Sequence, residues 1–263
     1  MWESIIVNPF ANILLMIYKL AGGGPHAFGV AIILFTLLIR LVTYPLMNSQ
    51  IKSSAKMQEL QTNKKWQETQ KKYKGDKEKL AQEQMKVYKE LGINPLSSCL
   101  PLLIQMPIIF ALYQSIVRAL AASPAQLHIL EGAVWQFFGL PELIPVNSQF
   151  LWMNLGQPER VYAFGVGIPV LAIIVGITTY IQSKVTMVTP ANPQDQTAAM
   201  NRSMTLMMPL MLFWFSLNYA SGLAVYFIVS NVLGIAQYAL MGKVNWKNLI
   251  PGRKPQLPAG GKR

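Results

Sequence analysis

Several uninterrupted apolar runs of about 20 residues constrain the fold of this chain more than any other feature of its sequence. Residues 27–47, 99–120 and 162–185 each form such a run. A helix of about 20 apolar residues crosses the ~30 Å hydrocarbon core of a bilayer. Only 13% of all residues are charged, whereas soluble domains carry about 25%. The sequence therefore predicts an integral membrane protein.

A longer apolar stretch, residues 203–241, is interrupted by the polar and small residues of 218–222. This break predicts a tight hairpin of two spans. The first of these has about 14 residues and reaches only ~21 Å along its axis. The bilayer beside so short a span must become thinner, or polar side chains must extend to the interface.

The N-terminal residues 5–20 are also apolar, but we expect them to lie in the membrane interface. Asn8 followed by Pro9 is typical of a helix N-cap with proline at the first helical position. The remaining helix, about 12 residues or ~18 Å long, is too short to span. Asn8, Asn12 and Lys19 would form one narrow polar face. A sixth span is the alternative.

The distribution of basic residues predicts the orientation. Of the 23 Lys and Arg residues, 19 lie in 48–98, in 184–202 or after residue 241. Loops rich in Lys and Arg stay in the cytosol. We therefore expect the N-terminus outside and the C-terminus in the cytosol.

The predicted fold class is an all-α polytopic membrane protein with five transmembrane helices, an N-terminal interfacial helix and a cytosolic helical hairpin. The expected segments are an amphipathic interfacial helix at 1–25, span one at 26–47, the cytosolic hairpin at 48–98, span two at 99–120, an outer interfacial loop at 121–161, span three at 162–185, a cytosolic loop at 186–202, span four at 203–217, span five at 222–241 and a basic cytosolic tail at 242–263.

The hairpin and the tail are the candidate cytosolic contact regions. Residues 48–91 are rich in helix formers, with a single break at 74–76 and few apolar residues, which predicts a mobile helical hairpin or a solvated helix pair without a partner. The tail contains basic residues, Pro and Gly but no acidic residue, which predicts disorder. It could bind anionic lipid or ribosomal RNA, but the positive-inside rule alone would also account for its charges.

Arg40 is the most informative single residue because it lies inside span one. It is seven residues from the end of that span, about 10 Å from the cytosolic edge, where an arginine costs ~3 kcal/mol or more. No Asp, Glu or His lies in the apolar runs 27–47, 99–120, 162–185 and 203–241. Thr36 and Thr43 share its helix face and favour a wet, positively charged cavity open to the cytosol. Extension of Arg40 to lipid headgroups is the alternative.

Other spans offer polar faces too. The candidate residues that line the cavity are Arg40, Thr36, Thr43, Gln105, Thr178, Gln182, Tyr226 and Ser230. For Gln105 and Gln182, interhelical hydrogen bonding is an equal alternative. Met204, Met208 and Met211 share one face of span four and could form an adaptable apolar surface for substrates, although ordinary packing is the more common role of methionine.

Metal and enzyme chemistry find little support in the sequence. One Cys and two His residues provide no credible set of metal ligands, and no cofactor is expected. The spans contain no acid–base pair and no nucleophile with a base at helical spacing, so we expect no enzyme. A small transporter or ion-coupled carrier is the rival interpretation, because several spans contain proline. It predicts intramembrane carboxylates and repeated halves, and neither is visible.

The local sequence resembles the YidC family of membrane protein insertases. The resemblance starts with Gly-Ile-Asn-Pro-Leu at 92–96, Cys-Leu-Pro at 99–101 and Gln-Met-Pro-Ile at 105–108. Leu-Ile-Arg at 38–40, Phe-Leu-Trp at 150–152, Tyr-Ile-Gln-Ser-Lys at 180–184, Gly-Leu at 222–223, Tyr226 and Ser-Asn at 230–231 match in order. Many members carry a polar second aromatic residue where this chain has Phe227.

The resemblance implies a short form of the family, without a large outer domain, located in the bacterial inner (cytoplasmic) membrane. It implies five spans around a hydrophilic groove that contains the span-one arginine, and it adds Phe227 and Asn231 to the candidate groove residues. It also implies insertase and chaperone activity on nascent membrane proteins. The partners expected from it are the ribosome, contacted by the tail and the hairpin, anionic lipid, the Sec translocon and the signal recognition machinery.

Overall fold

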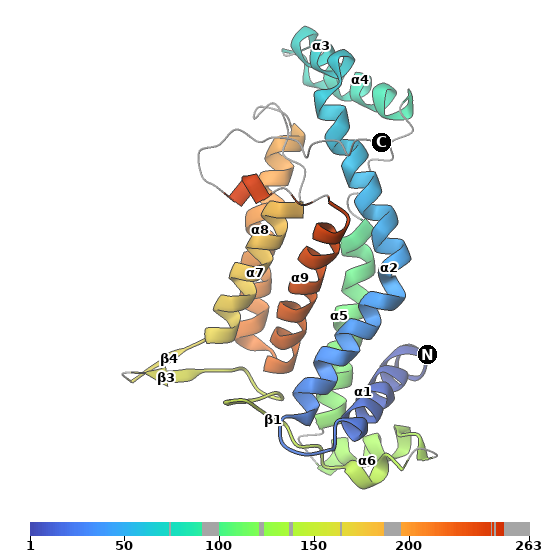
Figure 1. Cartoon of the computed structure of the whole chain (residues 1–263), viewed down its shortest axis with the longest axis vertical. Coiled ribbons are helices and arrows are strands. Elements are labelled where there is room, and N and C mark those ends of the chain that lie inside the picture. Colours follow the sequence, from blue (N-terminus) through green and yellow to red (C-terminus); the bar gives the residue numbers. More distant parts are fainter. Residues whose placement is uncertain are drawn as a thin grey trace. The chain divides into compact units, whose positions relative to one another are not determined.

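The structure is a computed structural model, and it describes residues 1–73, 75–90, 100–120, 124–136, 139–163, 165–186, 196–242, 244 and 246–249. Most of these residues are helical (Figure 1), which confirms the predicted helical membrane class. The helices are α1 (Asn8–Leu20), α2 (Ala27–Thr62), α3 (Lys64–Lys72), α4 (Lys77–Glu90), α5 (Leu100–Leu120), α6 (Pro124–Ala133), α7 (Val170–Thr186), α8 (Gln196–Asn218) and α9 (Ser221–Leu240). Short 3-10 helices occupy Pro141–Leu143 and Trp246–Leu249.

Several of these helices are apolar enough for a bilayer. Among the described residues, three are both long and apolar enough to cross it: Glu3–Leu20, Ala27–Ser53 and Ser221–Leu240. The apolar helices Val170–Thr186 and Thr205–Asn218 are shorter. α8 itself begins at Gln196, inside the predicted loop 186–202, so the length of the fourth span and the total of five spans stay predictions.

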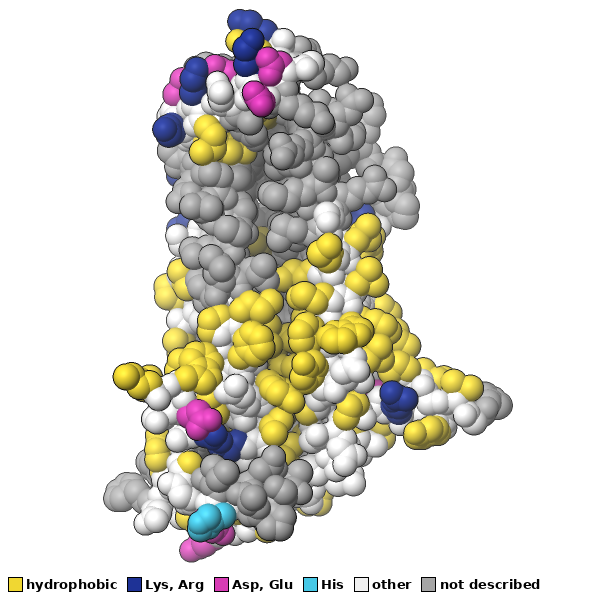
Figure 2. Space-filling model, turned by 180° about the vertical axis from the view of Figure 1, so that it is seen from behind, with side chains coloured by type: hydrophobic (Ala, Val, Ile, Leu, Met, Phe, Trp, Pro, Cys, Tyr) yellow, Lys and Arg dark blue, Asp and Glu magenta, His cyan; other side chains and the backbone are white. Residues whose placement is uncertain are grey.

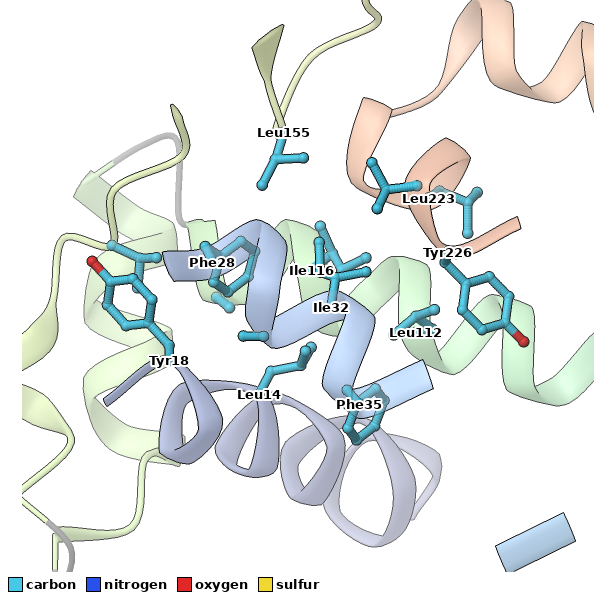
Figure 3. Close-up of a cluster of buried hydrophobic side chains, with 14 of the residues drawn as sticks. Leu14, Tyr18, Phe28, Ile32, Phe35, Leu112, Ile116, Leu155, Leu223 and Tyr226 are labelled. Carbon is cyan, nitrogen blue, oxygen red and sulfur yellow. The ribbon is translucent and has the colours of Figure 1, made fainter. Parts of the chain in front are cut away.

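The chain divides into two compact units. The larger unit contains Met1–Val42, Ile104–Tyr180 and Met208–Leu233, and the smaller contains Thr43–Leu103, Ile181–Met207 and Gly234–Arg263. The core of the larger unit is formed by buried side chains of α1, α2, α5 and α9 and of the turn after residue 154 (Figure 3). Its central members include Leu14, Phe28, Phe35, Leu112, Ile116, Leu155, Leu223 and Tyr226.

Two glycines allow this core to close. A Cβ atom on Gly29 would lie 2.0 Å from the ring of Phe150, so only glycine lets that ring pack against α2. A Cβ atom on Gly222 would lie 3.2 Å from the carbonyl oxygen of Leu155. The backbone N–H of Gly222 donates to that oxygen at 3.0 Å, which seats the start of α9 on the turn after β2.

The segment between α6 and α7 contains four short strands that the sequence did not predict. β1 (Gln149–Phe150) pairs with β2 (Met153–Asn154), and β3 (Val161–Ala163) pairs with β4 (Val166–Ile168), both antiparallel. Strands of two or three residues are too short to show the alternating pattern that identifies a strand in sequence.

The predicted start of the N-terminal helix is wrong. A π-helical turn covers Glu3–Val7 and runs directly into α1, so Pro9 lies within a continuous helix. The N–H of Asn8 donates to the carbonyl of Glu3, five residues back. This wider turn accommodates the proline ring, which would otherwise clash with the turn before it. The helix is therefore long enough to cross a bilayer, whereas a helix starting at Asn8 is not.

Of the polar face predicted for this helix, Lys19 is exposed and Asn8 is half-buried, but Asn12 is not at the surface. Asn12 is buried, and its side-chain amide donates to the carbonyl oxygens of Asn8 and Ala133 at 2.8 and 3.0 Å. Its side-chain oxygen accepts the backbone N–H of Trp135 at 2.7 Å. Asn12 thus fastens α1 to the end of α6 instead of facing the headgroup region.

In the smaller unit, α2 continues past the predicted end of span one to Thr62, with Pro45 inside it. The helix α3 ends at Lys72 and α4 begins at Lys77, so the turn that Gly75 predicts lies between them. Asp76 then caps α4 by accepting the N–H of Lys79 at 3.1 Å, and this hydrogen bond lowers the pKa of the Asp76 carboxyl. Buried Trp66, Val87 and Tyr88 form a small core between the two helices.

Candidate functional site

Arg40 lies on α2 and contacts α9. It is half-buried, and its Nη2 donates to the carbonyl oxygen of Ser230 at 2.6 Å and to the Ser230 hydroxyl at 2.7 Å. Ser230 is itself buried. A helix carbonyl is the negative end of a peptide dipole, so it stabilises a guanidinium without a carboxylate. Two neutral oxygens of a neighbouring helix therefore hold Arg40 between apolar helices.

A second contact joins α9 to α5. The Gln105 side-chain amide donates to the hydroxyl of Tyr226 at 2.6 Å. Tyr226 is buried and lies one helical turn before Ser230. One face of α9 thus bonds to both α5 and α2.

A third contact joins α9 to α7. The Asn231 amide donates to the hydroxyl oxygens of Thr178 and Thr179 at 3.1 and 2.9 Å. Phe227, one turn earlier on α9, is buried beside this contact. The sequence patterns did not select Thr179, because only Thr178 stands four residues from Gln182. Its signal was its position next to Thr178 in an apolar run.

We call these residues the α9 polar network. Its members are Arg40 on α2, Gln105 on α5, Thr178 and Thr179 on α7, and Tyr226, Ser230 and Asn231 on α9. All of them lie in the larger unit. The network gathers one cation and several neutral donors and acceptors between apolar helices. It can hold a charge and exchange hydrogen bonds, and it has no acid–base pair among its members.

The other predicted groove residues contribute differently. Thr36 is buried, and its hydroxyl donates to the carbonyl of Ile32 on its own helix at 2.6 Å. Such a bond satisfies the hydroxyl within α2. Phe227 contributes no hydroxyl. Thr43 and Gln182 are half-buried and belong to the smaller unit.

The predicted methionine surface differs from the exposed face of α8. Met208 and Met211 are half-buried, and Met211 packs against the core of the larger unit. The side chain of Met204 lies outside the described residues. The exposed apolar side chains of α8 are Leu206, Met207, Leu210 and Trp214. Cys99, most of the predicted cytosolic loop and most of the basic tail also lie outside the described residues.

Comparisons with known proteins agree with this architecture. The family model described as 60Kd inner membrane protein matches residues 16–248. Membrane protein insertase MisCA of Bacillus subtilis is 33% identical over all of this chain and 85% of its own length. Membrane protein insertase YidC 2 of Bacillus anthracis is 33% identical over 91% of this chain and 80% of its own length.

This chain is also similar to part of a longer relative and to part of a solved structure. Membrane protein insertase YidC of Syntrophobacter fumaroxidans is 34% identical, and the alignment covers 90% of this chain but 37% of that protein. The crystal structure of an active YidC insertase with its first transmembrane domain resolved is similar with a TM-score of 0.54 and 26% identity. The match covers 92% of this chain and 46% of that one.

Proposed function

Because the chain belongs to the YidC family of membrane protein insertases, we propose that it inserts nascent membrane proteins into the bacterial cytoplasmic membrane. The observation that carries the proposal is the α9 polar network, which holds Arg40 among helices whose outer faces are apolar. Polar groups at this depth are expensive unless they face protein or water. A polar path for a substrate would account for their presence.

The proposed mechanism is partial translocation through a groove that opens to the cytosol and to lipid. The polar tail or loop of a nascent protein enters the groove. There, water, Arg40 and Gln105 replace part of the hydration that the tail loses. Transfer of about 20 apolar substrate residues into lipid provides the driving force. No covalent step is required.

The apolar segment of the substrate would slide along the lipid-exposed side of the same helices. Ile173, Ile177 and Tyr180 on α7 are exposed and stand four and three residues apart, so they form one stripe. Val232 is exposed on α9. Hydrophobic side chains gather over the helices of this unit in Figure 2. The stripe would let a substrate helix contact lipid and protein at once.

The short apolar helices support this mechanism. The apolar part of α8 after Arg202, residues 203–218, measures about 24 Å at 1.5 Å per residue, and the 17 residues of α7 measure about 25 Å. Both are shorter than the ~30 Å hydrocarbon core. A bilayer that thins around them shortens the distance over which a polar tail is dehydrated.

The proposed partners follow from charge. The basic tail and the cytosolic hairpin, α3 with α4, would contact the ribosome or anionic lipid through phosphates, and such contacts weaken as salt rises. The Sec translocon and the signal recognition machinery are further proposed partners. Removal of 243–263 should reduce ribosome binding at low salt and leave the fold intact.

Reconstitution of the purified protein alone tests the function. Vesicles containing the protein should insert a small single-span substrate and protect its N-terminal tail from added protease. Empty vesicles and vesicles with an unrelated membrane protein of similar size serve as controls. Equal protection in all three would refute the proposal.

A further inference from the structure

The β3–β4 hairpin stands directly before α7 and is fixed to its first turn. β4 ends at Ile168 and α7 begins at Val170, with only Pro169 between them. Before β3, the buried carboxylate of Glu159 accepts the backbone N–H of Leu171 at 3.0 Å and the indole N–H of Trp152 at 3.1 Å. Both ends of the hairpin are thus held at the level where α7 starts.

The two faces of the hairpin differ in chemistry. Val161 pairs with Ile168, and Val166 follows on the same face because its partner, residue 163, is two residues from Val161. Val166 is 63% exposed and Ile168 is 37% exposed. Two exposed aliphatic side chains on the same face of so short a hairpin favour an apolar environment. This side, Val161, Val166 and Ile168, is the aliphatic face.

The opposite face combines an aromatic ring with a cation. Tyr162 pairs with Gly167 and is 76% exposed. A Cβ atom on Gly167 would lie 3.3 Å from the Tyr162 ring and 3.5 Å from Cδ of Arg160, so both side chains extend across the glycine. Tyr162 and Arg160 form the polar face of the hairpin. Tyrosine and arginine are both suited to the headgroup region, because each side chain has an apolar part that contacts acyl chains and a polar tip that contacts headgroups.

The charge of this segment is also one-sided. Arg160 is exposed, whereas its neighbour Glu159 is buried and bonded. The hairpin therefore presents a cation without its adjacent carboxylate. In Figure 1 it projects from the larger unit beside the start of α7, and Figure 2 shows hydrophobic side chains and a basic side chain on this projection.

We propose that the β3–β4 hairpin is a membrane anchor that lies in the bilayer interface next to the first turn of α7. Its aliphatic face contacts acyl chains, and Arg160 and Tyr162 contact lipid phosphates. Because α7 is shorter than the hydrocarbon core, the hairpin extends the apolar surface beyond the N-terminal end of this helix. The proposal rests on α7 spanning the membrane, as in the proposed function, but not on the mechanism of insertion.

Spin labels at three positions test the anchor in phospholipid vesicles that contain only this protein. Each label is attached to a single cysteine introduced on a Cys99→Ser background: Val166→Cys on the aliphatic face, Ile177→Cys on the exposed stripe of α7, and Glu142→Cys as an exposed control in the 3-10 helix. Collisions with oxygen, which concentrates in lipid, are compared with collisions with a water-soluble nickel chelate. Val166 and Ile177 should favour oxygen, and Glu142 should favour nickel.

The pattern of results separates the two proposals. Nickel accessibility at Val166 equal to that at Glu142, with Ile177 still in lipid, would overturn the anchor alone and would instead favour a docking site for a protein. Nickel accessibility at Ile177 would overturn the membrane placement of α7 and with it the proposed function. Arg160→Glu should move the Val166 label toward water, and more so in vesicles with phosphatidylglycerol than in pure phosphatidylcholine. No movement in either vesicle would refute the phosphate contact.

Discussion

Arg40 carries the charge of the α9 polar network, and its partners in that network are the neutral oxygens of Ser230. Its charge should therefore matter more than a bidentate geometry. We expect Arg40→Lys to retain much of the insertion activity, Arg40→Ala to lose it and Arg40→Glu to lose more, most strongly for substrates with acidic tails. The measurement is protease protection of substrates whose tails differ only in the number of Asp and Glu residues.

Protein levels in the membrane provide the control for the Arg40 series, since misfolding also lowers activity. Equal insertion by the Lys, Ala and Glu variants across all tails would mean that Arg40 is only an anchor at the interface. The charged groove would then have to be abandoned.

The bond from Asn231 to Thr179 should stabilise the contact between α9 and α7. Interhelical hydrogen bonds in membranes contribute about 0.6 kcal/mol on average and up to ~1.7 kcal/mol. A double-mutant cycle of Asn231→Ala and Thr179→Val, measured by reversible unfolding in detergent, should give a coupling energy in this range. The pair Val232→Ala and Thr179→Val is the matched control, because Val232 is exposed, and its coupling should be near zero. Equal coupling in both cycles would contradict the assignment.

At the scale of elements, the N-terminal helix depends on a polar seam along α5. Arg118 pairs with Glu3 at 3.2 Å and donates to the side chain of Asn8, and the indole of Trp2 donates to Gln114 at 2.9 Å. Arg118→Ala should release this helix, and a loss of about 1 kcal/mol corresponds to amide exchange about fivefold faster in residues 3–20. Hydrogen–deuterium exchange with mass spectrometry measures it.

The matched control for Arg118 is Arg160→Ala, which removes an exposed arginine from the β3–β4 segment without touching the seam. Exchange in residues 3–20 should stay as in the parent protein. If Arg118→Ala leaves this exchange unchanged, the core contacts of Leu14 and its neighbours alone dock the helix.

The sequence predicted the residues of the network better than their partners. Arg40, Gln105 and Asn231 stand out because polar side chains are rare in apolar runs. Which polar residue meets which, however, depends on how each helix is rotated against the next, so the pairing of Gln105 with Tyr226 was not predictable. The start of the N-terminal helix was mispredicted because Asn8 does not cap a helix. The helical conformation already begins at Glu3, where Arg118 pairs with the carboxylate. Strands of two or three residues gave no periodic signal at all.

For the whole molecule, the proposed orientation places Cys99 near the cytosolic end of span two, since the lysine-rich loop ends just before it. A membrane-impermeant thiol reagent should therefore label Cys99 from the cytosolic side of inverted vesicles and not from outside intact cells. A Glu142→Cys, Cys99→Ser variant should show the opposite pattern. Labelling of Cys99 from outside would invert the topology.

The position of α9 in the network has a consequence for the order in which the protein itself is made. Within six residues, 226–231, this helix bonds to α2, α5 and α7, and it is the last of the four to leave the ribosome. Gln105, Arg40 and Thr178 form these bonds only once residues 226, 230 and 231, respectively, have been synthesised. An incomplete chain that ends after α8 therefore lacks the helix to which those polar groups bond, and we expect such a chain to be degraded faster than the complete protein. Assembly of the bundle is completed from its C-terminal end.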